Sequence, residues 1–206
     1  TGVSDVANIV LNFSEIVEAS SAAKFITIKK GNDVVEAIDV RGSQVTGSGS
    51  TQITINPSVT LESQTAYHIL IDNGAIVDTA GASYAGISSD STFNFTTGDT
   101  INPSLNSSIP ANGATNVLES SNIILNFSEN VGIESGKKIK IKKTSDDTTI
   151  EVIDVSSDQV TGSGSAQITI NPISDFDENI EYTIVVDSAA FNDASSNSSA
   201  GITFSF

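Results

Sequence analysis

The chain has 206 residues, of which 25 are Asp or Glu and 9 are Lys or Arg, and its formal net charge is −16. This charge repels phosphate backbones and anionic lipids, so nucleic-acid binding and direct membrane binding are disfavoured. Cysteine is absent, which excludes disulfides and thiolate metal sites, and no apolar run approaches the roughly 18–20 residues that span a bilayer.

Short segments rich in β-branched residues follow one another from the N-terminus, with polar turns between them. Most alternate apolar and polar residues, which places one set of side chains on a core face and the other in water. Gly47–Ser50 is typical of a hairpin loop, because glycine accepts a positive φ without a Cβ clash. The predicted strands of this first part are Asn8–Ser14, Lys24–Lys30, Val34–Val40, Gln44–Thr46, Thr51–Asn56, Ala66–Asp72 and Thr92–Thr97.

The same plan then returns. Gln44–Pro57 recurs as Gln159–Pro172 with a single difference, Thr51 against Ala166. A period of about 115 residues is longer than that of solenoid repeats, so each copy is expected to be a whole domain. The predicted strands of the second copy are Asn122–Ser128, Lys138–Lys143, Thr149–Val155, Gln159–Thr161, Ala166–Asn171, Glu181–Asp187 and Ile202–Phe206.

About seven short strands per copy, with no helical period, predict an all-β fold of two antiparallel β-sandwiches. We place the domains at residues 1–99 and 100–206, with a linker at about 98–113 that is rich in Pro, Gly, Asn and Ser. The first domain would start inside its repeat. Since methionine is absent even at position 1, we expect a fragment or a processed product. The predicted core comprises Ile9, Leu11, Phe13, Ile53, Ile55, Phe93 and Phe95, with their second-copy counterparts.

Two stretches carry a resemblance to a known family. Pro110–Val117, followed by Ile124–Val131, resembles the opening of bacterial Ig-like domains of the S-layer SbsA type. Ile71–Gly81 is similar to the family's strand–loop pattern, although Ala82 stands where the family has Asn. The resemblance covers nearly the whole chain. It implies two tandem Ig-like antiparallel β-sandwiches from a large secreted or cell-surface bacterial protein, such as an S-layer protein or an adhesin.

The residues offer no catalytic constellation. His68 is the only histidine and aligns with Thr183, so a catalytic base built into the repeat is not expected. Neither a Gly-x-Ser-x-Gly motif nor a phosphate-binding loop is present. Lys138–Lys143 alternates Lys with Ile, which indicates either an anion-binding stripe or lysines that discourage edge-to-edge strand pairing. We therefore expect no enzyme activity.

Several carboxylates recur at aligned positions and are the candidate site residues. Ca²⁺ takes six to eight oxygen ligands, and a loop with two aspartates and backbone carbonyls could supply them. The alternative is that these aspartates cap turns by accepting hydrogen bonds from backbone N–H groups. The predicted metal residues are Asp72, Asp78, Asp187 and Asp193.

A second candidate calcium site lies at the joint between the domains. If the strands alternate in direction, Glu15, Glu18 and Asp99 share one pole of the first domain. The Asp146–Asp147 turn and the Asp187–Asp193 loop would share the facing pole of the second domain. Calcium between the poles would neutralise the carboxylates and fix the angle of the joint.

The function predicted from the sequence is a non-catalytic structural or spacer repeat, which calcium could stiffen. Its partners would be neighbouring repeats of the same chain, with a cell-surface glycan or protein as a further option. One alternative is a carbohydrate- or protein-binding module, for which Tyr84 is the one exposed anchor expected, because Trp is absent. The other alternative is a pair of accessory domains of an extracellular hydrolase.

Overall fold

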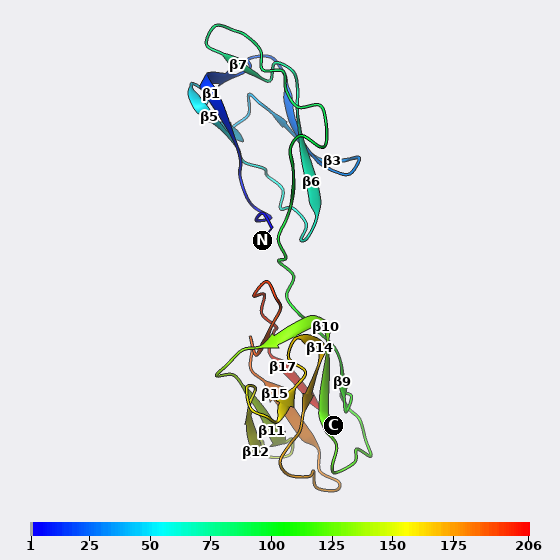
Figure 1. The fold of residues 1–206 in the computed structure, drawn as a ribbon. Helices are drawn as coiled ribbons and strands as arrows, with labels where there is room; N and C mark the ends of the chain where they lie inside the picture. Colours follow the sequence, from blue (N-terminus) through cyan, green and yellow to red (C-terminus); the bar gives the residue numbers. More distant parts are fainter. Residues whose placement is uncertain (1) are drawn as a thin grey trace. The chain divides into compact units, whose positions relative to one another are not determined.

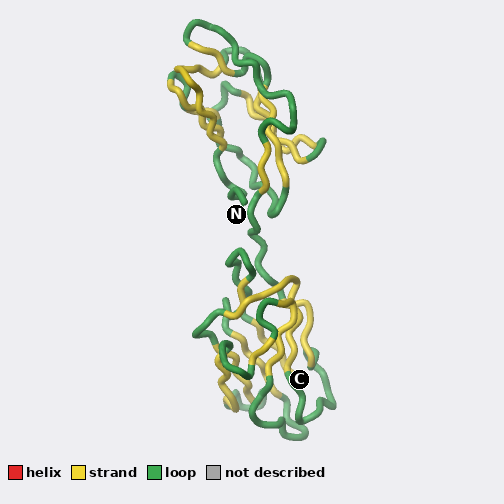
Figure 2. The backbone as a smooth tube through the Cα atoms, viewed as in Figure 1, coloured by secondary structure: helices red, strands yellow, loops and turns green. Residues whose placement is uncertain are grey.

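The computed structural model describes residues 2–206, which form strands and loops without a helix (Figures 1 and 2). The predicted all-β antiparallel fold is therefore confirmed. The chain divides into two compact units, Thr1–Thr100 and Ile101–Phe206, a boundary one residue from the predicted one. Among the described residues, no helix is long and apolar enough to cross a membrane.

The first unit contains two four-stranded sheets, in the orders β4-β5-β1-β7 and β3-β2-β6-β8. Every strand pairing in them is antiparallel. The strands are β1 (Ile9–Ala19), β2 (Phe25–Lys30), β3 (Asp33–Asp39), β4 (Val45–Thr46), β5 (Ser50–Ile55), β6 (Ala66–Ile71), β7 (Ile76–Asp78) and β8 (Asn94–Thr96).

The second unit repeats both sheets, in the orders β13-β14-β10-β16 and β12-β11-β15-β17, and adds β9 beside β10. Its strands are β9 (Leu105–Ile109), β10 (Ile123–Ile133), β11 (Lys138–Lys143), β12 (Thr149–Asp154), β13 (Val160–Thr161), β14 (Ser165–Ile170), β15 (Tyr182–Val186), β16 (Phe191–Asn192) and β17 (Ile202–Ser205).

The predicted linker at 98–113 is a strand in part. Leu105–Ile109 form β9, which pairs antiparallel with the first half of β10. Its sequence, Leu-Asn-Ser-Ser-Ile, is rich in small polar residues, so composition alone indicates a linker. The segment that joins the two units therefore also completes a sheet of the second unit.

The first long strand of each unit pairs with two neighbouring strands of its sheet. β1 pairs with β5 from Ile9 to Val17, with a register shift between Asn12 and Val17, and its end from Val17 also pairs with β7. In β10 the shift falls between Asn126 and Val131. An irregularity of this kind bends a strand and re-aims its side chains. It also interrupts the period-two pattern, which explains why the predicted strand ended too early, at Ser14.

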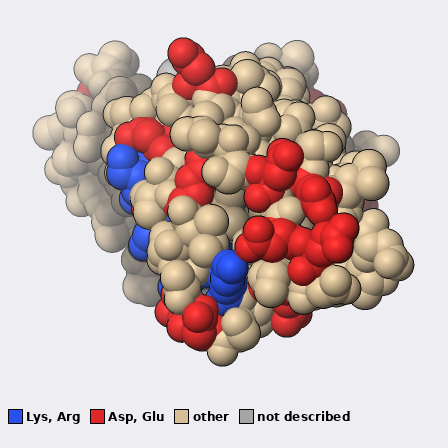
Figure 3. Space-filling model, turned by 90° about the horizontal axis from the view of Figure 1, so that it is seen from below, with Lys and Arg blue, Asp and Glu red and all other residues tan. Residues whose placement is uncertain are grey.

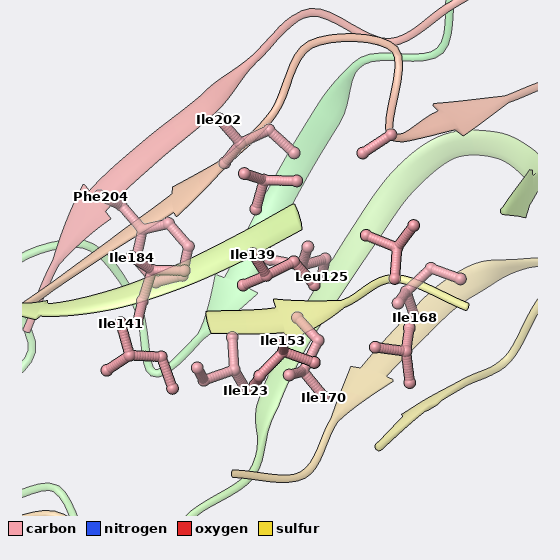
Figure 4. Packing of buried hydrophobic residues seen from close by; sticks show 14 of the residues in the cluster. Ile123, Leu125, Ile139, Ile141, Ile153, Ile168, Ile170, Ile184, Ile202 and Phe204 are labelled. Atoms are coloured by element: carbon pink, nitrogen blue, oxygen red, sulfur yellow. The ribbon is translucent and has the colours of Figure 1, made fainter. Parts of the chain in front are cut away.

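Each unit has its own core between its two sheets, built mainly from isoleucine. Figure 4 shows Ile123, Leu125, Ile139, Ile168 and their neighbours in the second unit, drawn from both sheets. The predicted core of the second unit is buried as expected. In the first unit, only Ile9, Ile53 and Ile55 of the predicted set are fully buried. Leu11, Phe13, Phe93 and Phe95 are only partly buried, although they pack against that core.

A tyrosine fixes the start of the sixth strand in the first unit and of its counterpart in the second. Tyr67 and Tyr182 are each 2% exposed. The hydroxyl of Tyr67 accepts a hydrogen bond from the Glu62 backbone N–H, and that of Tyr182 accepts one from Asp177, both at 2.9 Å. A tyrosine that bonds back to the backbone a few residues upstream is a known feature of Ig-type sandwiches. Both tyrosines thus serve the fold.

Candidate functional site

The most closely repeated segment of the chain is held by a carboxylate on β3, an edge strand of the other sheet. Glu36 Oε1 accepts a hydrogen bond from Gln44 Nε2 at 2.8 Å, and the Glu36 carboxylate also accepts the Ser58 backbone N–H. Gln44 Nε2 in turn donates to the Asn56 carbonyl oxygen. This latch, which ties β3 to the segments on either side of the β4–β5 hairpin, stabilises loops that carry no regular pairing of their own.

The second unit builds the same latch with the aligned residues. Glu151 Oε1 accepts a hydrogen bond from Gln159 Nε2 at 2.7 Å, and the same carboxylate accepts the Ile173 backbone N–H. Gln159 Nε2 donates to the Asn171 carbonyl oxygen at 3.0 Å. The recurring glutamate therefore stabilises loops of its own unit in both copies.

The hairpin inside this segment is fixed by glycine and serine. Gly162 has a φ of +97°, and a Cβ there would lie 2.1 Å from the Gln167 carbonyl oxygen, so only glycine fits. Ser165 Oγ donates to backbone carbonyl oxygens of the same turn, at Gly162 and Gln167. Gly47 and Ser50 repeat this geometry in the first unit. The Gly-Ser loop predicted from the sequence is confirmed as a hairpin loop.

The carboxylates at the ends of β3 and β12 take cationic partners. Hydrogen bonds from the Arg41 side chain and backbone lower the pKa of Asp39 to about 2. In the second unit, Lys138 Nζ lies 2.6 Å from the Asp154 carboxylate and, with Ser156, holds the pKa of Asp154 well below its ordinary range. Both carboxylates stay ionised at any physiological pH.

The Glu36 carboxylate is also held in its charged form. Burial alone would raise the pKa of Glu36, but hydrogen bonds from Ser58 and Gln44 outweigh burial and lower that pKa. A carboxylate that accepts several hydrogen bonds favours ionisation. Such a group acts as an acceptor and is not suited to donate a proton in acid catalysis.

Asp72 and Asp187, the first pair of predicted metal residues, cap the start of a neighbouring strand. Asp72 Oδ2 accepts the backbone N–H of Phe25, the first residue of β2, at 2.9 Å. Asp187 Oδ2 accepts the backbone N–H of Lys138, the first residue of β11, at the same distance. These contacts join residues 47 and 49 positions apart in the chain. These two aspartates therefore bind backbone N–H groups, as the capping alternative expects, but those of a distant strand and not of their own turn.

Asp78 and Asp193, the second predicted pair, cap their own loops. Asp78 Oδ1 accepts the backbone N–H groups of Ala80 and Ala82. Asp193 Oδ1 accepts those of Ser195 and Asn197, both at 2.8 Å. Within each unit, taken by itself over residues 2–100 or 101–206, no three acidic or histidine side chains bring ligand atoms within 4.8 Å of one another.

The expected acidic pole of the first unit is wrong. Asp99 accepts hydrogen bonds from Ser63 and Gln64, just before the start of β6. Glu18 pairs with Val77 on β7, beyond the end of β6, and Glu15 lies between Asn12 and Val17 on the half of β1 that leads there. The six residues of β6 span about 20 Å at roughly 3.3 Å each. The strands do alternate in direction, but the long β1 carries its glutamates to the far end.

The expected acidic pole of the second unit is wrong as well. Asp146 and Asp147 lie in the turn that follows β11, where Asp147 accepts a hydrogen bond from Lys142. Asp187 instead binds Lys138, at the other end of β11. The two loops therefore lie at opposite ends of the same strand. Asp146 caps its own turn, since its Oδ1 accepts the Thr148 backbone N–H, which lowers its pKa.

The lysines of β11 form neither an edge guard nor an open anion-binding stripe. β11 lies between β12 and β15, so it is an interior strand. Lys138, Lys142 and Lys143 each lie within 3.0 Å of a carboxylate, those of Asp154, Asp147 and Asp177. Sheet order cannot be read from an isolated Lys-Ile pattern, which explains the wrong prediction.

His68 and Tyr84 are both packed within the first unit. His68 is 7% exposed on β6, with Nε2 4.0 Å from the Asp90 carboxylate. At the aligned position, the Thr183 hydroxyl shares hydrogen bonds with Thr144 and Ser205. Tyr84, expected to be an exposed anchor, is partly buried, with its ring edge-on to Phe13 at 5.5 Å. Loop position alone did not reveal this packing.

A groove of about 870 Å³ lies in the second unit between residues 113–120 and 175–182. Figure 3 shows acidic side chains in several groups on the visible surface, with few basic ones between them. In the groove, acidic side chains accompany the aromatic Phe176, Tyr182 and Phe206. Its carboxylates are those of Glu119, Asp175, Asp177, Glu178 and Glu181.

The first unit shows which residue occupies the position equivalent to this groove. There Thr97, only 2% exposed, bridges to Val3 and accepts the Thr65 backbone N–H with its hydroxyl oxygen at 2.9 Å. Val3 and Thr65 align with Val117 and Ile180, which line the groove of the second unit. The groove thus lies where Thr97 pairs in the first unit.

Comparison with known proteins gives one family and several distant structural likenesses. The family model of the bacterial Ig-like domain matches residues 1–97 and again residues 99–206. None of the curated proteins matches the chain.

Three solved structures are similar at low identity. They are the chicken CNTN1 FN1-FN3 domains (12% identity, 100% of this chain, TM-score 0.28), ICOS in complex with ICOS-L and an anti-ICOS-L VNAR domain (8%, 99%, 0.29), and the BSP domain of a biofilm associated protein (14%, 93%, 0.23). The chain spans 60%, 95% and 27% of these three chains, respectively. At these TM-scores, the likenesses carry no argument about function.

Proposed function

The chain belongs to the bacterial Ig-like domain family and contains two domains of that family. On this premise we propose that it is a non-catalytic structural repeat of a secreted or cell-surface bacterial protein. Domains of this family are structural repeats found in bacterial surface proteins. The parent protein would be an S-layer protein, an adhesin or a giant surface protein, in which such units extend and space other parts.

One observation carries this proposal: the recurring glutamates of the latch, serines of the hairpin and aspartates Asp78 and Asp193 bind backbone or side-chain groups of their own unit. Residues with potential chemistry, such as His68, differ between the copies. A repeat that keeps its turn-stabilising residues and varies its reactive side chains is suited to a structural role.

The partners follow from the same argument. We propose neighbouring repeats of the same protein as the first partners, because the segment that joins the two units here is itself strand β9 of the second unit. A surface glycan or protein stays a second proposal. A glycan array probed with residues 1–206 tests it, and saturable binding to a defined glycan would favour the binding module over the spacer.

Location is tested on cells. An antibody raised against residues 1–206 should label intact cells of the source organism as strongly as permeabilised ones. Labelling that requires permeabilisation would contradict the surface assignment. An antibody against a cytosolic protein of the same cells serves as the control for intactness.

Calcium stiffening is a separate proposal. It is supported by the charge of −16 and by the recurrence of Asp72, Asp78, Asp187 and Asp193, although all four already serve as caps. A thermal melt in excess Ca²⁺ and in EDTA tests it. An ion at 100 times its Kd adds about 2.7 kcal/mol of stability, a rise of several degrees for domains of this size. Superimposable melts would leave these aspartates as caps alone.

A further inference from the structure

The first unit has an aromatic contact that the second unit lacks. In the first unit, the ring of Tyr84 lies edge-on to that of Phe13, with the ring centroids 5.5 Å apart. The counterpart of Phe13 in the second unit is Phe127, and the residue aligned with Tyr84 is Ser199. The second unit therefore has a hydroxymethyl group where the first unit has a phenol ring.

The backbone holds the two aligned positions in the same way. The Tyr84 N–H donates a hydrogen bond to the Ile76 carbonyl oxygen at 2.9 Å, and the Ser199 N–H donates one to the Phe191 carbonyl oxygen at 2.8 Å. Ile76 and Phe191 are also aligned, and both are 0% exposed. Tyr84 and Ser199 thus start from equivalent places, and their side chains decide what fills the space beyond.

A small cavity in the second unit, called here the Ser199 pocket, lies beside this serine. Its volume is about 270 Å³, and its walls are residues 102–105, Phe127 and residues 199–202. The Phe191 ring packs on Phe127 at a ring distance of 5.1 Å but does not line this cavity. A cavity of about 150 Å³ is enough to bind benzene. The Ser199 pocket therefore has room for a single aromatic ring.

The wall of the pocket combines apolar groups with an unsatisfied hydroxyl. Pro103, Leu105 and Ile202 supply hydrocarbon, and Phe127 supplies a ring. Ser199 is 4% exposed, and its Oγ is buried without a hydrogen-bond partner among residues 2–206. Leaving a buried hydroxyl unpaired costs stability, and a serine hydroxyl can rotate toward a partner that enters. A ligand with one hydrogen-bonding group would supply that partner.

We propose that the Ser199 pocket binds a small monocyclic aromatic compound with one hydrogen-bonding substituent, of which phenol is the simplest. The ring of the ligand packs on Phe127 as the Tyr84 ring packs on Phe13, in the edge-to-face geometry that aromatic pairs favour. The substituent forms a hydrogen bond with Ser199 Oγ. The inference does not depend on the structural role proposed above.

A titration of residues 1–206 with phenol, in which backbone amides are followed by NMR, tests the proposal. We expect saturable shifts at Leu105, Ser199 and Ile202, with a dissociation constant on the order of 1 mM for a ligand of this size. The absence of saturable shifts at these residues would overturn the proposal, as would shifts of equal size throughout both units.

Variants of Ser199 make the result specific. Ser199→Tyr supplies the ring from the chain itself, so it should abolish phenol binding and raise the melting temperature of the second unit by a few degrees. Ser199→Ala keeps the space but removes the hydroxyl, so it should weaken phenol binding about threefold to tenfold and leave the binding of toluene nearly unchanged. Tyr84→Phe in the first unit is the matched control and should change neither affinity. Phenol binding that survives Ser199→Tyr, or an equal effect of Ser199→Ala on phenol and toluene, would overturn the proposal.

Discussion

Aligned side chains occupy equivalent positions in the two units but differ in burial, so each unit serves as a control for the other. Phe13 and Phe127 occupy equivalent positions, yet Phe127 is 4% exposed and packs on Phe191 at a ring distance of 5.1 Å, while Phe13 is partly open. The hydrophobic contribution of a side chain grows with the apolar area that it removes from water. The two phenylalanines should therefore differ in what they add to stability.

We expect Phe127→Ala to cost about 3–5 kcal/mol of unfolding free energy in the second unit, the usual range for a buried aromatic. Phe13→Ala should cost clearly less in the first unit, because its side chain is incompletely covered. Denaturant unfolding of both variants measures the difference. Equal losses would show that the partial exposure of Phe13 does not matter.

The ion pair at Asp39 predicts a pH dependence. The pKa of Asp39 is lowered to about 2 by Arg41, so this group adds stability above its unfolded pKa, near 3.8, and loses that contribution as the pH falls toward 2. Asp39→Asn should flatten the fall in melting temperature between about pH 4 and pH 2. Arg41→Gln, which removes the side-chain partner but keeps the backbone N–H, should flatten the fall less. A variant that keeps the full slope would contradict the assignment.

At the scale of elements, sequence patterns predicted the strands whose apolar residues alternate and missed the others. Ile53 and Ile55 mark β5 clearly, and both are fully buried. Strand β9 was taken for a linker because Asn106, Ser107 and Ser108 give no alternation. Strands β7 and β16, of three and two residues, are too short for any periodic signal.

The candidate site was predicted only in part, for a related reason. Capping by Asp78 is local, over two to four residues, and loop composition indicates it. The bond from Phe25 to Asp72 and the latch from Ser58 to Glu36 span 47 and 22 residues. Such contacts depend on sheet order, which a single sequence does not contain. The lack of information on sheet order also explains why the poles predicted for Glu15 and for Asp146–Asp147 are wrong.

The repeated hairpin allows a matched test of one element. Gly162 and Gly164 both have positive φ, but a Cβ at Gly162 would meet the Gln167 carbonyl, whereas one at Gly164 meets nothing within 4 Å. We expect Gly164→Ala to cost about 1–2 kcal/mol through backbone strain alone. Gly162→Ala should cost more, because the Gln167 backbone must also move. Similar unfolding free energies for the two variants would exclude the steric account.

At the scale of the whole molecule, the two units are separate folding modules, each with its own core and its own latched hairpin. The second unit has the additional strand β9, and its counterpart of Phe13 is fully covered. If the chain is a structural repeat, each unit should resist force as one cooperative body. The first unit should yield earlier, since Leu11, Phe13, Phe93 and Phe95 are only partly buried in it.

The measurement that tests this account most directly is single-molecule stretching of residues 1–206 between its ends. About 100 residues at roughly 3.6 Å each give on the order of 30 nm of released chain per unit, after allowing for the folded length. The account predicts two separate unfolding events of that size. Phe127→Ala should shift the force of one event only, which identifies that event as the second unit. The other, weaker event then belongs to the first unit. Extension without discrete events, or one event releasing both units together, would contradict it.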